Sequence, residues 1–362
     1  MLDPIYAKEQ FRLDSRLVGC TPYGFGHINS TYLVVTETGR RYILQGINRH
    51  VFADTEGLMR NIAAVTRHIG AKQSDVRGAL HLVPTLDGAD YYTDKNGEHW
   101  RMYDFVEGSL CLQQPETADD FYQSAVAFGT FQQQLADFPA ETLCETIPNF
   151  HNTPSRYAAL REAVERDVCG RAATCEYEIR EYLAREKDAS ALTDMLSRGE
   201  LPLRVTHNDT KLNNVMLDEM TRTPLCVIDL DTVMPGLMAY DFGDSIRFGA
   251  STAAEDERDL SRVSMDIELY RTFTRGFVGV CDNMTDNELA SLPLGAKLMT
   301  LECGARFLTD YLSGDVYFAV HRDGHNLDRC RTQLKLVQDM EAKWGEMNAI
   351  VLAEREASRA AK

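Results

Sequence analysis

The sequence lacks the features that define secreted, membrane-spanning and zinc-finger proteins. Its nine cysteines are odd in number and contain no Cys-x-x-Cys pair, which predicts reduced, mostly buried thiols rather than a disulfide scaffold or a zinc finger. No apolar stretch approaches the roughly 20 residues that cross a bilayer. The residues after Met1 also lack the basic and apolar regions of a signal peptide. We therefore expect a cytoplasmic protein.

Basic side chains are scarce as well. Lys and Arg number 38 against 55 Asp and Glu, and the formal net charge is −17. Binding to nucleic acid or to an anionic membrane depends on basic residues, so we expect neither as a partner, and no obligate protein partner is evident. An anionic substrate would need a metal ion or one well-placed cation. No GxxxxGK[ST] or GxSxG motif occurs, which disfavours P-loop kinases and serine hydrolases.

Two lobes are expected, because 362 residues exceed one core of ordinary size. Residues 1–106 are rich in β-branched and aromatic strand patterns and contain one amphipathic helix. The expected elements are strands at 31–36 and 41–45, a helix from Asp54 or Thr55 to Gly70, and a hairpin around Asn96-Gly97. The first lobe is therefore predicted to be a β-sheet lobe with one helix.

Residues 107–362 have mainly helical patterns. A loose capping box at 117–120 predicts the start of a helix, and a short β-rich island between residues 203 and 228 interrupts the helical segments. Long helices are expected at about 174–197, 255–279, 285–312 and 328–356. The second lobe is therefore predicted to be larger than the first and mostly helical.

The most informative motif lies in this β-rich island, where residues 207–214 follow the pattern H-x-D-x-x-x-x-N. Phosphoryl transfer needs a carboxylate that orients and deprotonates the acceptor hydroxyl, and oxygen ligands for a metal ion that neutralises the phosphates. Asp209 is the candidate for the first role and Asn214 for the second. Asp229, at the end of an apolar strand, is the candidate second Mg²⁺ ligand. Lys211 is a candidate to meet the γ-phosphate of ATP.

These motifs resemble the aminoglycoside phosphotransferase and choline kinase superfamily, over nearly the whole chain. The resemblance implies Asp209 as the catalytic aspartate, and Asn214 and Asp229 as the ligands of Mg²⁺. It also implies a protein-kinase-like two-lobed α+β fold, in which an N-terminal antiparallel β-sheet lobe with one helix (1–106) binds ATP and a larger helical lobe (107–362) carries catalysis and the substrate. The other segments that carry the resemblance are 24–29, 41–45, 227–236, 306–312 and 314–318.

Several residues of the first lobe are candidates for nucleotide binding. Gly24 and Gly26 form a glycine turn between strands, which would cover the phosphates, although a plain hairpin turn is an equal alternative on the local pattern. The segment from Asp104 to Val106 would offer backbone groups to adenine.

One departure from protein kinases concerns the cation that holds the phosphates. Kinases place a lysine on the third strand and pair it with a helix glutamate, whereas Gln45 occupies that position here. Glutamine donates a hydrogen bond but carries no charge. Anchoring of the phosphates would then depend on Mg²⁺ and on Arg41, Arg49 or Lys211.

Three polar residues near the motif are expected to be structural. Asp241 is expected to cap a helix and brace the catalytic loop, and His207 to orient the backbone of that loop. For Asp231, a structural hydrogen bond is at least as probable as assistance at the metal.

The acceptor is expected to be a small sugar. Within the superfamily the motifs are most similar to kinases that phosphorylate the anomeric hydroxyl of N-acetylglucosamine or N-acetylgalactosamine, and Arg306 and Tyr317 are the expected contacts with hydroxyl or acetamido groups. Another amino sugar, an amino alcohol or an aminoglycoside is the alternative acceptor. A catalytically silent nucleotide-binding regulator is a further alternative, which Gln45 motivates and the intact Asp209 argues against.

Overall fold

The computed structural model describes residues 2–24 and 28–361, and these form two compact units, each assembled from separate parts of the sequence. Among the described helices, none combines the length and the apolar sequence of a membrane span. The first unit comprises Met1–Cys111, Asp137–Pro148 and Val215–Pro235, and the second comprises Leu112–Ala136, Asn149–Asn214 and Gly236–Lys362.

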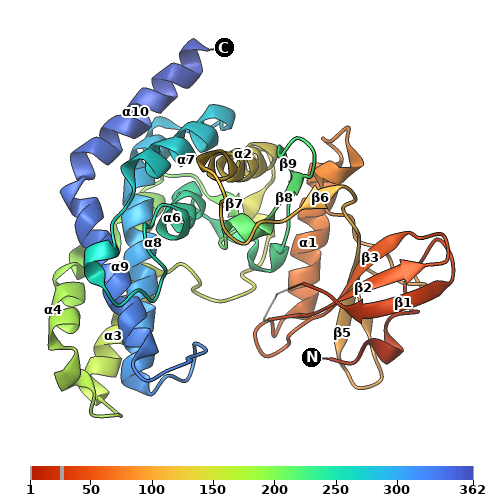
Figure 1. The fold of residues 1–362 in the computed structure, drawn as a ribbon, viewed down its shortest axis with the longest axis horizontal. Coiled ribbons are helices and arrows are strands. Elements are labelled where there is room, and N and C mark those ends of the chain that lie inside the picture. Colours follow the sequence, from red (N-terminus) through yellow and green to blue (C-terminus); the bar gives the residue numbers. More distant parts are fainter. Residues whose placement is uncertain (1, 25–27, 362) are drawn as a thin grey trace. The chain divides into compact units, whose positions relative to one another are not determined.

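The first unit is built on a five-stranded antiparallel sheet with the strand order β1-β2-β3-β5-β4 (Figure 1). The strands expected at 31–36 and 41–45, and the hairpin around Asn96-Gly97, are confirmed. The strands are β1 (Leu17–Pro22), β2 (Ser30–Thr36), β3 (Arg41–Gly46), β4 (Tyr92–Thr93) and β5 (His99–Asp104).

The two faces of this sheet differ in character. Side chains alternate between the faces of a strand, and one face packs a hydrophobic cluster that includes Val34, Leu44 and Trp100. Gln45 and Arg101 stand directly opposite each other on β3 and β5, and therefore lie on the other face. That face carries the buried side chain of Arg101, a residue type that is almost never fully buried unless it is paired.

The rest of the first unit comprises one long helix and a small second sheet. The helix expected from Asp54 or Thr55 to Gly70 is α1 (Thr55–Gly70), whose N-cap Asp54 accepts a hydrogen bond from the backbone of Gly57. A three-stranded sheet has the order β6-β8-β9. Its strands and the elements that follow in the chain are β6 (Ser109–Leu110), β8 (Val215–Asp218), β9 (Pro224–Val227), the 3-10 turn η7 (Leu230–Thr232) and β10 (Met234–Gly236).

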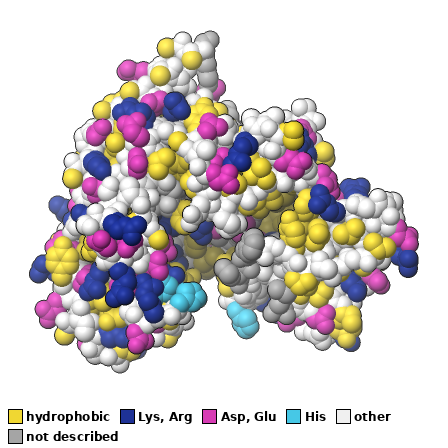
Figure 2. Space-filling model, viewed as in Figure 1, with side chains coloured by type: hydrophobic (Ala, Val, Ile, Leu, Met, Phe, Trp, Pro, Cys, Tyr) yellow, Lys and Arg dark blue, Asp and Glu magenta, His cyan; other side chains and the backbone are white. Residues whose placement is uncertain are grey.

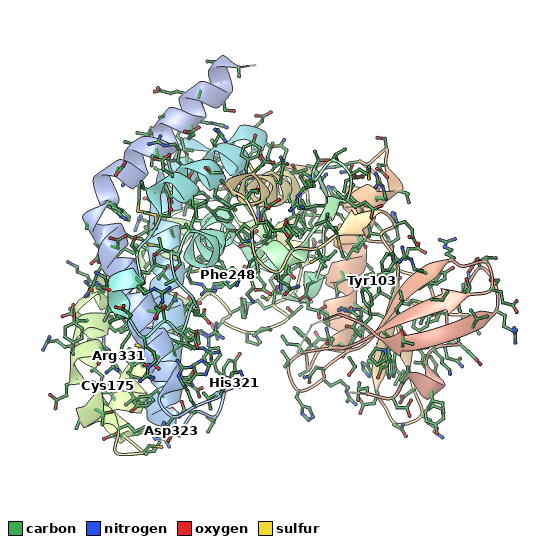
Figure 3. All side chains as sticks on the ribbon, in the orientation of Figure 1. Tyr103, Cys175, Phe248, His321, Asp323 and Arg331 are labelled. Atoms are coloured by element: carbon green, nitrogen blue, oxygen red, sulfur yellow. The ribbon has the colours of Figure 1, made fainter. Side chains whose placement is uncertain are left out.

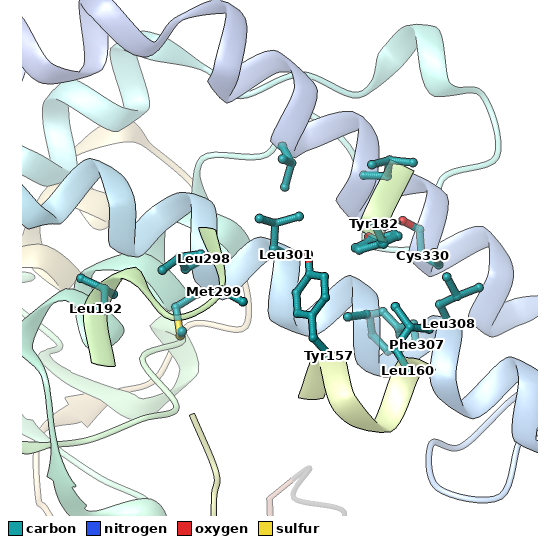
Figure 4. Packing of buried hydrophobic residues seen from close by; sticks show 14 of the residues in the cluster. Tyr157, Leu160, Tyr182, Leu192, Leu298, Met299, Leu301, Phe307, Leu308 and Cys330 are labelled. Carbon is teal, nitrogen blue, oxygen red and sulfur yellow. Dashed lines mark hydrogen bonds between the residues drawn. The ribbon is translucent and has the colours of Figure 1, made fainter. Parts of the chain in front are cut away.

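The second unit is helical, with one short strand, β7 (Arg204–Thr206), just before the H-x-D-x-x-x-x-N motif. The most extensive packing joins α8 to α6 and α9, and α2 to α7 (Figure 1). Tyr157, Tyr182 and Leu301 are buried in its main hydrophobic cluster (Figure 4). The helices are α2 (Ala118–Gln134), α3 (Thr153–Arg166), α4 (Glu176–Ala184), α5 (Ala191–Ser197), α6 (Met238–Gly249), α7 (Ile267–Val280), α8 (Asp286–Ser313), α9 (His325–Ala342) and α10 (Trp344–Ala360).

Two helix starts agree with the sequence signals. Thr117 forms the expected capping box with Asp120 at the start of α2. The helix expected at 285–312 is α8, which begins after a second capping box at Thr285 and ends at Gly314, whose φ of 97° suits a residue without a Cβ.

Three of the four long helices were predicted with wrong boundaries. The segment 174–197 is divided between α4 and α5, because the chain tightens into a 3-10 turn after Arg185. The segment 255–279 is helical only from Ile267, because Ser251 and Met265 form a β-bridge that shapes the preceding loop. The segment 328–356 breaks at Lys343, whose ammonium donates to the backbone oxygen of Met265.

Acidic and basic side chains are interspersed over each unit on the face shown in Figure 2. The acidic excess of the composition does not form one continuous acidic field on that face. All nine cysteines are free thiols. Only four are buried, namely Cys175, Cys226, Cys281 and Cys330, while Cys111 and Cys169 are exposed and the others are half-buried, so the expectation that most are buried is wrong.

Candidate active site

The loop that follows β7 is held in place by a buried aspartate of α6. The Asp241 carboxylate accepts hydrogen bonds from the backbone N–H groups of His207 (2.9 Å) and Asn208 (2.8 Å), and a third from the Gln132 side chain (2.7 Å). Asp241 is fully buried, and this burial raises its pKa in spite of these donors. The expected brace is confirmed. Asp241 lies in the first turn of α6 and is not the N-cap, which is Leu237.

A second anchor on α6 holds the middle of the same loop. Asp244 accepts the backbone N–H of Thr210 at 3.1 Å, and the Ser245 hydroxyl donates to the Thr210 carbonyl at 2.9 Å. Burial alone would raise the pKa of Asp244, but the cations of Arg247 and Lys211 hold it below its ordinary value. Residues three and four apart share one face of a helix, so a single face of α6 fixes the loop.

His207 and Asn208 complete the shape of the loop. The His207 ring is buried edge-on against Phe128 and Phe131, and its Nδ1 lies 3.3 Å from the backbone nitrogen of Asp209. This contact fits the expected role of His207 in orienting the loop backbone. Asn208 has a φ of 66°, a left-handed conformation that asparagine tolerates better than most residues.

The structure brings three predicted site residues together in the second unit. The Lys211 ammonium lies 2.7 Å from Oδ1 of Asp209. The side-chain amide of Asn214 donates to the backbone oxygen of Asp209 at 2.8 Å and to its Oδ2 at 3.2 Å. Because the amide nitrogen faces Asp209, the amide oxygen of Asn214 is turned to the other side, where it can meet a cation.

Asp229, the other predicted metal ligand, belongs to the first unit. It follows β9 and has a φ of 58°, a strained conformation for a residue with a Cβ that recurs at functional positions. Its donor chemistry fits a magnesium ion, since hard cations prefer carboxylate and amide oxygens. That Asp229 and Asn214 together hold a magnesium ion, which would neutralise charge on the phosphates, stays a prediction from the sequence.

Gln45 is not alone at the position where kinases carry lysine. Nε and Nη2 of Arg101 donate to its side-chain oxygen at 3.0 and 2.8 Å. Nη1 of Arg101 forms an ion pair with Asp231, and the guanidinium is 1% exposed. Arg101 was not among the residues predicted from the sequence, where its only signal is an arginine between Trp100 and Met102 in β5. Asp231 therefore has a structural partner, which was one of the two roles expected for it.

The remaining nucleotide-binding candidates also lie in the first unit. Gly24 has a φ of 78°, and Gly26 lies outside the described residues. The carboxylate of Asp104 pairs with Arg40 at 2.8 Å. The backbone oxygen of Val106 accepts the Ser109 hydroxyl at 2.6 Å. Aromatic and basic side chains gather at this end of the sheet, where the residues in contact are Tyr23, Phe105, Arg41 and Glu107.

The two arginines proposed as substitutes for the kinase lysine are otherwise engaged. Arg41 forms an ion pair with Glu107, and Arg49 donates to the backbone oxygen of Gly97 at 2.7 Å. The buried cation beside Gln45 is Arg101 instead. Tyr103 of β5, labelled in Figure 3, lies next to it with its ring centre 5.3 Å from the guanidinium carbon.

Arg306 and Tyr317 meet in a pocket of about 220 Å³ in the second unit. Nη2 of Arg306 lies 3.3 Å from the Tyr317 hydroxyl, and the guanidinium also lies over the rings of Phe150 and Phe318. Arg156 lines the same pocket, and within the described parts of the chain neither arginine has a carboxylate within ion-pair distance. The residues that line the pocket are Arg156, Ala159, Arg306, Thr309, Asp310, Ser313, Val316, Tyr317 and Phe318.

A partly buried pair, His151 and Glu302, links the part of α8 that carries Arg306 to the loop that carries Asp209. Nε2 of His151 lies 3.3 Å from the backbone oxygen of Asn208, and its Nδ1 lies 2.9 Å from Glu302. Glu302 precedes Arg306 by one turn of α8, about 6 Å along the helix axis. This connection has no local signature in the sequence, because His151 and Glu302 are 151 residues apart.

The loop that carries Tyr317 is fixed by a buried carboxylate. Asp310 accepts the backbone N–H groups of Val316, Tyr317 and Phe318 at 2.9, 2.8 and 2.9 Å. Asn326 at the start of α9 donates to the same carboxylate at 2.8 Å. The pocket wall is therefore anchored to two helices. The chain continues from this wall through the segment with His321 and Asp323, labelled in Figure 3.

The sequence matches the profile of the Phosphotransferase enzyme family over residues 19–271. The match covers more than half of the chain, which therefore belongs to this family. The protein is a phosphotransferase that uses an alcohol group as its acceptor.

Solved structures with the same fold align over nearly the whole chain. An aminoglycoside phosphotransferase from Alicyclobacillus acidocaldarius is 14% identical, with a TM-score of 0.59 over 99% of this chain and 97% of its own. A microcompartment-associated aminopropanol kinase is 15% identical, with a TM-score of 0.58 over 96% and 99%. A choline kinase from Cryptosporidium parvum is 13% identical, with a TM-score of 0.56 over 95% and 92%. The α+β, kinase-like fold class expected from the sequence is confirmed.

Proposed function

We propose that this phosphotransferase moves the γ-phosphate of ATP, with Mg²⁺, to the anomeric hydroxyl of an N-acetylhexosamine, as a cytoplasmic N-acetylhexosamine 1-kinase. The observation that carries the acceptor class is the pocket in which Arg156 and Arg306 lie without carboxylate partners in the described chain. Two such guanidinium groups repel a cationic acceptor and suit one rich in hydroxyl and carbonyl oxygens.

The chemistry of the acceptor side follows from the loop. Asp209 would accept the proton of the anomeric hydroxyl, which is more acidic than an ordinary alcohol, so a carboxylate is an adequate base. Lys211 lies close enough to Asp209 to meet the charge that develops on the transferred phosphoryl group. Asn214 and Asp229 would hold the magnesium ion.

The nucleotide side is assigned to residues 1–106. In this proposal Gly24 and Gly26 cover the phosphates, the backbone at Asp104 and Val106 meets adenine, and Gln45 lies near the phosphates. Lys211 would contact the γ-phosphate from the catalytic loop. Residues 107–362 would supply catalysis and acceptor binding.

Arg306 and Tyr317 are the proposed contacts with the hydroxyl and acetamido groups of the sugar. The aromatic rings around Arg306 fix the direction of its guanidinium. Burial lowers the pKa of Arg156, and the nearby Arg306 cation lowers it further. An acceptor oxygen placed between them would relieve this repulsion.

An amino alcohol or aminoglycoside is the second candidate acceptor. The observation in its favour is the fold shared with an aminopropanol kinase and a choline kinase. A cationic acceptor would need acidic residues in the pocket. There, the Asp310 carboxylate is already occupied by three backbone N–H groups and Asn326.

A panel of acceptors tests the proposal. ADP release would be measured with ATP and Mg²⁺ for N-acetylglucosamine, N-acetylgalactosamine, glucosamine, 1-amino-2-propanol, choline and an aminoglycoside. The proposal expects turnover with the N-acetylated sugars and loss of turnover when their C1 hydroxyl is blocked as a methyl glycoside. Preference for an amine would support the second candidate, and the absence of ADP with every acceptor would favour the silent regulator.

A further inference from the structure

We propose that Arg101, held by Gln45 and Asp231, replaces the lysine–glutamate pair of protein kinases as the buried cation that positions the metal-binding segment around Asp229. Arg101 would be a positioning residue, acting through Asp231, and not a phosphate contact. The inference rests on the proposed role of Asp229 in holding Mg-ATP. It does not depend on which acceptor the enzyme uses.

The cation is supplied by a neighbouring strand. Gln45 on β3 and Arg101 on β5 are register partners, so their side chains leave the sheet side by side on one face. The Gln45 oxygen accepts two N–H groups from Arg101, and its amide donates to Thr31 on β2 at 3.2 Å. A lysine at position 45 would set a second cation against Arg101. The glutamine is the residue type that this arginine requires.

Asp231 is the ion-pair partner of Arg101, and both its carboxylate and its backbone oxygen accept hydrogen bonds. Nη1 of Arg101 pairs with one carboxylate oxygen, and Nδ2 of Asn29 donates to the other at 2.5 Å. The Thr146 hydroxyl donates to the backbone oxygen of Asp231 at 3.0 Å. Asp231 lies two residues after Asp229, so these bonds fix the 3-10 turn that carries Asp229 at its start.

The helix of this unit contributes a neutral contact in place of the kinase glutamate. Asn61 of α1 is buried and donates to the backbone oxygen of Val233 at 3.1 Å and to that of Cys144 at 2.8 Å. The sheet therefore holds the beginning of the 229–233 segment, and the helix holds its end. In kinases one ion pair joins the strand to the helix, whereas here each is joined to the metal-binding segment.

The neighbours of Arg101 favour its charged form. Burial alone would lower the pKa of Arg101, but Asp231 outweighs it and Asp229 adds to the effect, so the pKa lies above its ordinary value. A cation buried within reach of both aspartates also offsets their mutual repulsion.

A purely structural ion pair is the competing explanation, and three variants separate it from the proposal. Arg101→Met removes the cation. Arg101→Lys keeps the positive charge but loses the planar guanidinium, whose nitrogens reach Gln45 and Asp231 together. The double change Gln45→Lys with Arg101→Met moves the cation to the position of the kinase lysine. Arg16→Met is the matched control, because Arg16 forms an exposed ion pair with Glu37 in the same unit.

The measurements are equilibrium binding of ATP with Mg²⁺, binding of Mn²⁺ with ATP followed by electron paramagnetic resonance, and the midpoint of thermal unfolding. We expect Arg101→Met to weaken Mg-ATP binding by about tenfold or more, Arg101→Lys to weaken it less, and the double variant to recover part of the loss. Arg16→Met should leave binding unchanged.

Unchanged Mg-ATP and Mn²⁺ binding in folded Arg101→Met would overturn the inference. If that variant fails to fold, Arg101→Lys and Asp231→Asn carry the test, and wild-type binding in both would overturn it equally. Failure of the proposed function looks different, because an enzyme that phosphorylates no sugar would still show the dependence of Mg-ATP binding on Arg101.

Discussion

The ammonium of Lys211 lies 2.7 Å from Oδ1 of Asp209, so the proposed catalytic base is paired with a cation two residues along the same loop. The pair has a clear use in phosphoryl transfer. As the aspartate takes the proton of the acceptor, its own charge is neutralised, and the lysine is then able to stabilise the negative charge on the transferred phosphoryl group.

Removing the carboxylate charge should stop turnover without loss of the nucleotide. Asp209→Asn keeps the shape of the side chain but cannot accept the hydroxyl proton, so we expect kcat to fall by about 10²–10⁴-fold and ATP binding to change little. Steady-state kinetics and isothermal titration measure both quantities. Asp323→Asn is the control in the same unit, and substantial residual activity in Asp209→Asn would remove the assignment.

The Lys211 pair also predicts a pH dependence. Burial alone would lower the pKa of Lys211, but Asp209 and Asp244 raise it above its ordinary value of 10.5. A raised pKa means that the pair stabilises the fold fully below 10.5 and that this contribution is lost as the pH rises through the higher folded value.

The test compares wild type with Lys211→Met in chemical denaturation. The stability difference between them should stay constant from neutral pH to about pH 9 and shrink only in strongly alkaline solution. A difference that already disappears between about pH 7 and pH 9 would show that Lys211 titrates near neutrality and contradict the pairing.

The brace of the loop should matter for stability and for rate. Asp241→Asn leaves a side-chain amide facing backbone N–H donors, and we expect it to lower the free energy of unfolding by about 1–3 kcal/mol. Because Asp241 fixes the backbone next to Asp209, kcat should fall in the folded variant. Urea denaturation and initial rates measure the two effects. Wild-type values for both would show that Asp241 is not needed to hold the loop.

The first unit could be predicted from its local patterns, and the site only in part. Alternating strands and a capped helix gave β2, β3 and α1 close to their observed bounds. The H-x-D-x-x-x-x-N spacing singled out Asp209 and Asn214, which the fold brings into contact.

Contacts between distant parts of the sequence could not be predicted from local patterns. The pairing of Arg101 with Asp231 joins residues 130 apart, and neither strand pattern nor turn chemistry encodes it. The return of residues 215–235 to the first unit likewise has no local signature. Helix boundaries failed where tertiary contacts, such as that of Lys343 with Met265, override the helical period.

The acceptor pocket predicts a selective effect on one substrate. Arg306→Met should raise the KM for N-acetylhexosamine by about tenfold and leave the KM for ATP unchanged, because the guanidinium lies in the acceptor pocket. Arg166→Met, an exposed arginine of α3 paired with Glu162, is the matched control. Equal changes in both KM values would place Arg306 outside a specific acceptor site.

The proposed role of Asp229 as a metal ligand predicts a change in magnesium dependence. Asp229→Ala should weaken Mg-ATP binding by about 10–100-fold or more and leave binding of free acceptor intact. Asp218→Ala removes a carboxylate from the end of β8 that pairs with Arg77, and serves as the control. A magnesium titration identical to wild type would exclude Asp229 as a ligand.

The most direct test of the account is the phosphorus NMR spectrum of the product formed from N-acetylglucosamine, ATP and Mg²⁺. The account predicts a phosphate coupled to the anomeric proton for the wild-type enzyme and no such product with Asp209→Asn. A phosphate on any other hydroxyl, or the same product from both enzymes at similar rates, would contradict it.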